Sequence, residues 1–204
     1  MGKKVIVGLD FDGVVAYNPF RIARAPISYV KRRLLGVTKT QFFVPRNGFE
    51  RIFWIIMFES SIFPALGTAL LRQRVGEGKI EAHLVTGRFH FMKDRLVAWL
   101  ERFKLAGLFS SVSVNERNEQ PHRFKQRVIT QKRFDYYIED NLDIVRYLQG
   151  KTSTRIFWIY NVLDRGITYR DKYPYLKKAL EAVTMRQSDQ SLDFARDKSD
   201  QSDQ

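Results

Sequence analysis

The stretch Val5-Ile6-Val7-Gly8-Leu9-Asp10-Phe11-Asp12-Gly13 decides the fold class of this chain. Its first five residues form an apolar run of strand length, which is typical of a strand buried on both faces of a parallel sheet. The run ends at two carboxylates in an i, i+2 pair, Asp10 and Asp12, and a glycine follows them. Because ligands bind outside the carboxyl ends of the strands in open parallel sheets, these residues indicate the start of a functional site.

Four further apolar runs of strand length follow, and helical patterns lie between them. The apolar runs span 80–85, 111–114, 136–138 and 155–160, and the helical patterns span 92–105, 123–132 and 142–148. Strands that alternate with helices are typical of a parallel sheet covered on both faces. We therefore expect an α/β fold with a Rossmann-like parallel sheet and helices on both of its faces.

Residues 17–71 break this rhythm, because ordinary connections between secondary-structure elements are much shorter. We interpret this stretch as a small, mainly helical cap that is inserted after the first strand. Residues 1–16 and 72–186 then form the α/β core. The cap is basic and rich in aromatic residues.

Two features of the cap bear on its partners. The rings of Phe20, Phe42 and Phe43 are of the kind that can stack on a substrate base. The stretch Ile52–Leu71 has twenty residues and a single charge, Glu59, and that length is enough to cross a bilayer. The polar residues and the proline near its centre favour a pair of buried cap helices instead.

The composition excludes several classes of protein. The 204 residues contain no cysteine, which excludes a disulfide scaffold, a cysteine-ligated zinc site and a cysteine nucleophile. The net charge of +13 attracts anions such as nucleic acid, acidic membranes or phosphorylated metabolites. The tail 187–204 is acidic and rich in Ser and Gln, so we expect disorder there. The N-terminus lacks the long apolar region of a signal peptide, so we expect a cytoplasmic protein.

Residues that suit phosphoryl transfer lie near the ends of the predicted strands. Thr86 and Gly87 follow the second run and offer a hydroxyl group and room for close approach. Glu139 and Asp140 follow the fourth run, and Lys125 lies near the start of the helix before it. Carboxylates bind hard cations such as Mg2+. A nucleophile, a metal ion and donors for developing charge are the groups that this chemistry needs.

The chain resembles the haloacid dehalogenase-like (HAD) phosphohydrolase superfamily in four motifs, which occur in the family's order. The motifs are Asp10-Phe11-Asp12-Gly13-Val14-Val15, Leu84-Val85-Thr86-Gly87-Arg88, Lys125 and Ile138-Glu139-Asp140-Asn141. Lys132 is the alternative for the third motif. Lys125 fits better, because in the family the lysine lies a helix-length ahead of the acidic pair. We interpret Arg88 as a helix cap or as the partner of an acid, and not as a catalytic residue.

This resemblance implies a role for each motif. Asp10 would attack phosphorus and form an aspartyl-phosphate, while Asp12 would protonate the leaving oxygen and later activate water. Thr86, Gly87 and Lys125 would hold the phosphoryl oxygens.

The resemblance also implies a bound metal ion and a class of reaction. Mg2+ would bind to Asp10, to the backbone carbonyl of Asp12 and to Asp140, with Glu139 binding directly or through water. In an alternative interpretation, Glu139 does not bind the metal ion and is only an outer or surface acid. Because family members that perform dehalogenation lack an acid at the position of Asp12, ester hydrolysis or phosphoryl mutation is favoured.

The inserted cap lies where the family has its C1 cap, and with the VTGR-like second motif it resembles the 5′-nucleotidase-like group. The implied activity is hydrolysis of a small phosphorylated metabolite, such as a nucleotide monophosphate. Two other functions stay open. The basic surface, including Lys31-Arg32-Arg33, suits a nucleic-acid-binding protein or a polynucleotide-end phosphatase. Residues 42–71 suit a protein that binds the surface of an anionic membrane, which we regard as the least favoured of the three.

Overall fold

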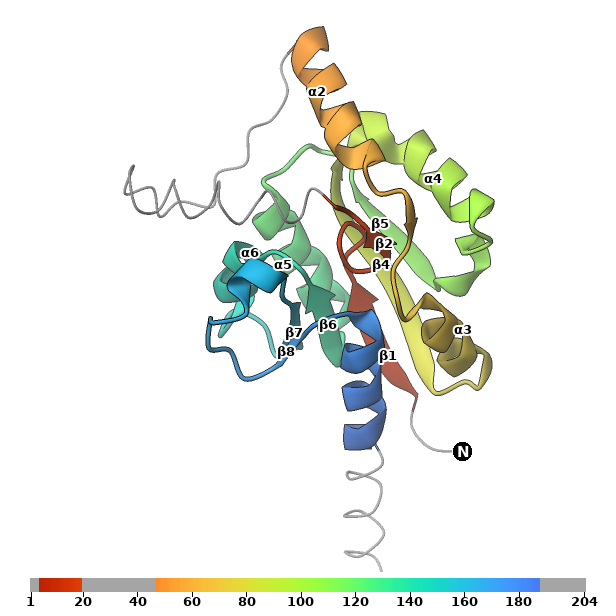
Figure 1. The fold of residues 1–204 in the computed structure, drawn as a ribbon, viewed down its shortest axis with the longest axis vertical. Coiled ribbons are helices and arrows are strands. Elements are labelled where there is room, and N and C mark those ends of the chain that lie inside the picture. The colour runs from red at the N-terminus through yellow and green to blue at the C-terminus, as the bar shows by residue number, and fades with distance from the viewer. Residues whose placement is uncertain (1–3, 20–46, 188–204) are drawn as a thin grey trace, which may run out of the picture.

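The computed structural model describes residues 4–19 and 47–187 (Figure 1). The residues Phe20, Phe42 and Phe43, the run Lys31-Arg32-Arg33 and the tail from 188 lie outside these ranges.

A six-stranded sheet forms the centre of the fold, and its strand order is β5-β4-β1-β6-β7-β8. All five neighbouring pairs are parallel. The strands are β1 (Val5–Leu9), β4 (Ile80–Phe89), β5 (Ser111–Asn115), β6 (Tyr136–Glu139), β7 (Arg155–Ile159) and β8 (Lys172–Tyr173). The predicted α/β fold with a Rossmann-like parallel sheet is therefore confirmed.

Helices cover both faces of the sheet (Figure 1). The helices are α3 (Thr68–Gly76), α4 (Lys93–Arg102), α5 (Pro121–Lys132) and α6 (Leu142–Leu148), and residues 176–187 form a further helix. Short 3-10 turns lie at His90–Met92, Ala106–Leu108 and Val162–Asp164. Two large hydrophobic clusters result among the described residues, one under α3, α4 and the C-terminal helix and one under α5 and α6.

The side-chain alternation of each strand separates these two clusters. Along β6, Tyr136 and Ile138 belong to the first cluster and Tyr137 belongs to the second. Along β7, Phe157 lies in the first cluster and Trp158 in the second. Because successive side chains point to opposite faces of a strand, an unbroken apolar run buries both faces. This alternation explains why the apolar runs at β1, β4, β6 and β7 mark strands, whereas β5 lies at the edge of the sheet and leaves Val112 exposed.

The stretch between β1 and β4 forms a second, two-stranded sheet. In this sheet β2 (Ala16–Tyr17) pairs antiparallel with β3 (Phe63–Pro64), and Tyr17 lies opposite Phe63. The described residues that enter and leave the insertion are therefore held side by side. Helix α2 (Gly48–Glu59) precedes β3.

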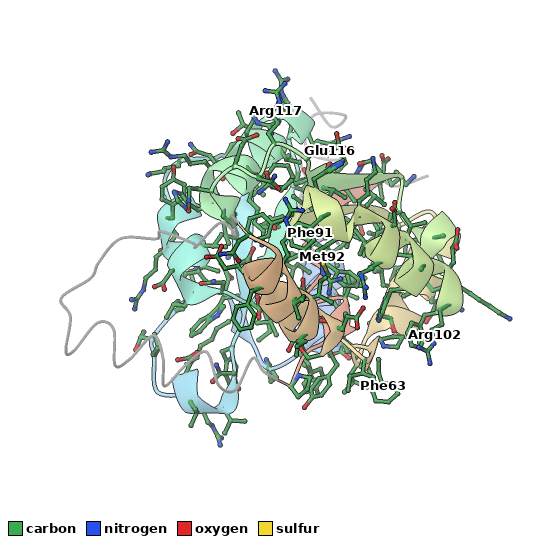
Figure 2. The ribbon with its side chains drawn as sticks, turned by 90° about the horizontal axis from the view of Figure 1, so that it is seen from above. Phe63, Phe91, Met92, Arg102, Glu116 and Arg117 are labelled. Atoms are coloured by element: carbon green, nitrogen blue, oxygen red, sulfur yellow. The ribbon has the colours of Figure 1, made fainter. Side chains whose placement is uncertain are left out.

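The apolar stretch Ile52–Leu71 is not one continuous helix, since α2 ends at Glu59 and α3 begins at Thr68. The described ranges contain no helix with both the length and the apolar character that crossing a membrane requires. The expected pair of buried helices is wrong in one respect, because Ile52 and Ile56 of α2 are exposed. Ile55 packs against Phe89 and Met92. Met92 lies next to α2 (Figure 2).

Gly8 offers a test of the packing between the sheet and its second cluster. A Cβ atom at this position would collide with the Phe134 ring and would lie 2.8 Å from Cδ2 of Tyr137. We expect Gly8→Ala to lower the free energy of unfolding by about 1–3 kcal/mol, because overpacking displaces buried rings. Chemical denaturation measures the change. The control Gly107→Ala meets no atom within 4 Å and should change stability by less than about 0.5 kcal/mol. Equal effects of the two substitutions would contradict this packing.

Candidate active site

Three neighbouring strands bring the predicted site residues to one edge of the sheet. Leu9 at the end of β1 lies opposite Leu84 of β4 and Ile138 of β6. Asp10 follows Leu9, Thr86 lies two residues beyond Leu84, and Glu139 follows Ile138. The backbone N–H of Asp10 donates to the Ile138 carbonyl at 2.9 Å, which fixes the start of the loop after β1.

Helix α5 contributes Lys125 to this edge. Its Nζ lies 2.9 Å from Oδ1 of Asp10 and 2.7 Å from Oε2 of Glu139, and all three side chains are buried. The close approach of α5 to β4 depends on Gly87, where a Cβ atom would lie 3.0 Å from Cβ of Pro121. Lys132, the alternative lysine, is the last residue of α5. The structure therefore places Lys125 in the cluster.

Glu139 is held by several donors besides Lys125. The Tyr137 hydroxyl donates to its Oε2 at 3.2 Å, and the backbone N–H of Asn141 donates to its Oε1 at 3.1 Å. The Asn141 side chain in turn caps α6 by accepting from the N–H of Asp143 at 3.0 Å. The carbonyl of Asp140 accepts a bond of 3.1 Å from the Trp158 indole. The acidic pair thus lies on a short, rigid connection between β6 and α6.

The carboxylates of Asp10, Glu139 and Asp140 form a buried group that could hold a metal ion. One oxygen of each lies within 4.8 Å of the others. Burial raises the pKa of the Asp10 carboxyl well above its usual range, and Glu139 adds to the rise while Lys125 opposes it. Burial opposes the charge on Lys125, but Asp10 and Glu139 outweigh this effect and raise its pKa. Three carboxylates facing one ammonium group suit a divalent cation, so the donor set fits Mg2+.

Asp12 lies apart from this group and is bound by Arg88. The Arg88 guanidinium donates from Nε to Oδ2 at 2.9 Å and from Nη2 to Oδ1 at 2.7 Å. This is the bidentate geometry that is strongest between arginine and a carboxylate. The guanidinium carbon also lies 4.5 Å from the centre of the Phe11 ring. Among the described residues, the Asp12 side chain does not belong to the group that could hold a metal ion, so only its backbone carbonyl remains as an expected ligand.

Thr86 and Arg88 are both buried near the end of β4, where the register of β4 against β5 shifts between Thr86 and Phe89. The Thr86 hydroxyl accepts from the backbone N–H of Arg88 at 3.2 Å, and this bond does not use the hydroxyl proton. Of the two sequence interpretations of Arg88, the structure shows the pairing with an acid.

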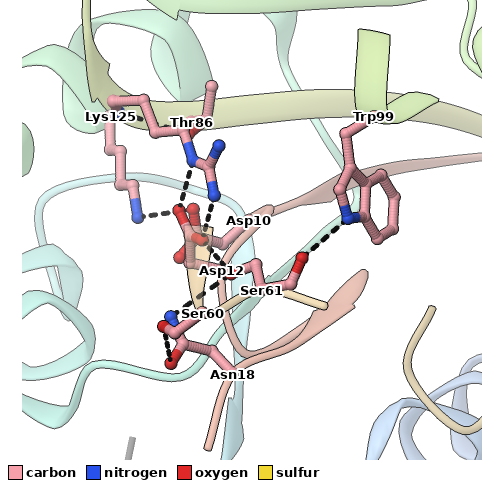
Figure 3. Close-up of polar contacts among 9 residues, drawn as sticks. Asp10, Asp12, Asn18, Ser60, Ser61, Thr86, Trp99 and Lys125 are labelled. Atoms are coloured by element: carbon pink, nitrogen blue, oxygen red, sulfur yellow. Dashed lines mark hydrogen bonds and ion pairs between the residues drawn. The ribbon is translucent and has the colours of Figure 1, made fainter. Parts of the chain in front are cut away.

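Two further side chains reach the site and have no signal in the sequence. The Ser61 hydroxyl donates to Oδ1 of Asp12 at 2.5 Å, and the Asn18 amide donates to the Ser61 hydroxyl at 3.2 Å (Figure 3). Ser61 is 49 residues from Asp12 and belongs to no motif. Only the folded insertion brings it to the site.

The arrangement can now be compared with known proteins. No protein-family model matches the sequence, and no curated protein matches it. Solved structures do match. A protein assigned as a beta-phosphoglucomutase from Thermotoga maritima is 16% identical with a TM-score of 0.58, and the match covers 89% of this chain and 99% of that one. CbbY from Rhodobacter sphaeroides is 13% identical with a TM-score of 0.56, and the match covers 86% of this chain and 96% of CbbY.

A HAD-superfamily hydrolase from Ehrlichia chaffeensis is 12% identical with a TM-score of 0.51, and that match covers 91% of this chain and 98% of the other. The chain has the fold of the HAD-superfamily hydrolases. In this HAD fold the loop after β1, the end of β4, the start of α5 and the end of β6 carry the four motifs of the sequence. The expected resemblance in fold is confirmed, and the similarity extends over almost the whole length of each neighbour.

The buried ion pairs of Lys125 can be tested through stability. We expect Lys125→Met to lower the free energy of unfolding by about 3 kcal/mol at neutral pH, because it leaves the Asp10 and Glu139 carboxylates buried without their counter-charge. Denaturant titration measures the loss. The control Lys178→Met removes an exposed pair with Glu181 and should cost less than about 0.5 kcal/mol. A loss for Lys125→Met as small as that of the control would contradict the buried pairing.

Proposed function

We propose that this protein is a Mg2+-dependent phosphatase that hydrolyses a small phosphorylated metabolite through an aspartyl-phosphate on Asp10. The observation that carries the proposal is the buried convergence of Asp10, Lys125 and the acidic pair Glu139-Asp140 at the carboxyl ends of adjacent parallel strands. A second carboxylate, Asp12, stands two residues from the nucleophile on the same loop. These groups match the parts that phosphoryl transfer to a carboxylate requires.

The donor set supports a bound Mg2+ ion. Asp10 and Asp140 would hold it with their carboxylates, Asp12 with its backbone carbonyl, and Glu139 directly or through a water molecule. When bound, the ion would neutralise charge on the phosphoryl oxygens and orient the phosphate. Glu139 also fixes Lys125, so its substitution would disturb the lysine as well as the metal.

The side chains then divide the reaction between them. An Asp10 oxygen attacks phosphorus, the bond to the leaving oxygen breaks, and the phosphoryl group stays on Asp10. Asp12 gives a proton to the leaving oxygen and then takes one from the water that hydrolyses the aspartyl-phosphate. The Thr86 hydroxyl, the backbone at Gly87 and the Lys125 ammonium hold the phosphoryl oxygens, where negative charge must be stabilised. A phosphomutase would share the first of these two steps.

We infer a small metabolite as substrate because the insertion after β1 lies where the HAD family has its C1 cap. CbbY, a neighbour in fold, has been solved in complex with phosphate, which supports a phosphate site in this fold. The second motif and the short cap favour a nucleotide monophosphate among such substrates. The net charge of +13 supports a second candidate, a phosphatase acting on polynucleotide ends, because polyanions bind basic surfaces.

Release of inorganic phosphate tests the proposal directly. We expect Mg2+-dependent release from at least one member of a panel of nucleotide monophosphates, sugar phosphates and oligonucleotides with terminal phosphates. Asp10→Asn should lower the rate by at least about 1000-fold, since the amide cannot act as the nucleophile. The exposed control Asp94→Asn should keep the parent rate. Hydrolysis by Asp10→Asn at the parent rate would contradict the proposal.

The order of substrates in this panel separates the two candidates. A metabolite phosphatase should prefer mononucleotides or sugar phosphates at all salt concentrations. A polynucleotide-end phosphatase should prefer the oligonucleotides and should lose this preference steeply as salt rises.

Metal binding can be measured without any substrate. At a Mg2+ concentration of about ten times the dissociation constant, the ion should stabilise the fold by about 1.4 kcal/mol, which corresponds to a rise in Tm of about 3–5 °C. Asp140→Asn should abolish this rise, because it removes a carboxylate from the binding group. Asp94→Asn should keep it. An equal Mg2+ effect on the parent and on Asp140→Asn would contradict the assigned metal site.

A further inference from the structure

We propose that Ser61 of the insertion is a positioning residue for Asp12, so that the insertion sets the geometry of the acid–base step; the inference rests on the proposed phosphatase function. The Ser61 side chain is 2% exposed, and its hydroxyl donates to Oδ1 of Asp12 at 2.5 Å. This length lies in the range of a strong bond between a hydroxyl and a charged oxygen. Arg88 binds the same carboxylate from strand β4.

A relay of polar groups fixes the direction of the Ser61 hydroxyl. The Ser60 hydroxyl donates to Oδ1 of Asn18 at 2.9 Å, and Nδ2 of Asn18 donates to Oγ of Ser61 at 3.2 Å (Figure 3). Because an amide nitrogen can only donate, the Ser61 oxygen accepts from Asn18 and its proton is directed to Asp12. The relay therefore ends at the carboxylate.

The backbone of Ser61 is held as firmly as its side chain. The indole Nε1 of Trp99 on α4 donates to the Ser61 carbonyl at 2.7 Å. The Trp99 ring meets the Phe11 ring edge to face at 4.8 Å, and Phe11 lies between Asp10 and Asp12 in the chain. One tryptophan therefore contacts both the loop that carries the two carboxylates and the residue that binds Asp12.

The pairing of β2 with β3 explains how Ser61 reaches this position. Asn18 follows β2 directly, and Ser61 lies two residues before β3. The two short strands bring the entering and leaving segments of the insertion together, and the relay closes across them. A change in this pairing would move the partner of Asp12 as well as the insertion.

The consequence for chemistry concerns the leaving group. Asp12 must point a proton at the leaving oxygen, and general acid catalysis of this kind contributes about 100- to 10,000-fold to a rate. Ser61 adds a donor from the insertion to the two that Arg88 supplies, so the orientation of the Asp12 carboxylate depends on the insertion as well as on β4. Loss of Ser61 should therefore slow the hydrolysis of substrates whose leaving oxygen needs a proton. It should have little effect on the hydrolysis of substrates whose leaving group is a stable anion.

The test compares two substrates through kcat/KM, which reports the steps up to release of the leaving group. One is the best alkyl phosphate found for the parent enzyme, and the other is p-nitrophenyl phosphate. We expect Ser61→Ala to lower kcat/KM about tenfold or more for the alkyl phosphate and less than about threefold for the aryl phosphate. Ser153→Ala changes an exposed serine that lies outside the relay, and it should lower both values of kcat/KM by less than about threefold. Ser61→Thr keeps the hydroxyl and should restore most of the alkyl rate.

Trp99→Phe provides a second variant that leaves Ser61 in place. It keeps a ring against Phe11 but removes the N–H that holds the Ser61 carbonyl. It should therefore lower kcat/KM more for the alkyl phosphate than for the aryl phosphate, as Ser61→Ala does, but by a smaller factor. If Ser61→Ala slows both substrates equally, or slows neither, the positioning role is wrong. In those two cases the Asp10-dependent activity of the parent is intact, and the proposed function stands. If the parent shows no Asp10-dependent hydrolysis, the proposed function fails and this inference fails with it.

Discussion

The parallel pairing of β1 with β4 on one side and with β6 on the other is the constraint on which the rest of the structure depends. Parallel strands end at the same edge of a sheet, so the residues that follow β1, β4 and β6 meet in space although they are distant in sequence. The register places Leu9 opposite both Leu84 and Ile138. A slip of one residue would send every side chain of the slipped strand to the opposite face and would separate the carboxylates.

Charge at this edge is arranged in two separate units. In the first, Lys125 faces Asp10 and Glu139, and the acidic group exceeds the positive charge that the lysine supplies. In the second, Arg88 and Asp12 balance each other. Buried charges are costly unless they are paired, so both pairings lower the cost of burying these groups. The excess of carboxylates in the first unit is what makes a divalent cation a fitting partner.

The insertion is connected to this site through its stem. Strands β2 and β3 have two residues each, and an isolated pair of that length would be unstable in water. Here the stem is supported by the hydrogen bonds of Asn18 and Ser61 and by the indole of Trp99. The same contacts hold Asp12, so the support of the insertion and the placement of the proposed acid share one set of bonds.

Most of the sheet could be predicted from the sequence because each central strand is buried on both faces and therefore reads as an apolar run. The predicted run 80–85 ends four residues before β4 does, since Thr86 and Arg88 are polar although buried. Strands β2, β3 and β8 were not predicted, because two residues carry no periodicity. The helix predicted at 142–148 has the observed bounds of α6.

The sequence by itself determined which residues can perform chemistry, because carboxylates at strand ends, a hydroxyl next to a glycine and a helix-borne lysine are local signals. Only the tertiary structure decided how these groups pair. It placed Arg88, from the irregular end of β4, on Asp12, and it brought Ser61 to the same carboxylate from 49 residues away. Contacts of that kind depend on the path of the chain between two points, and no spacing or composition in the sequence records that path.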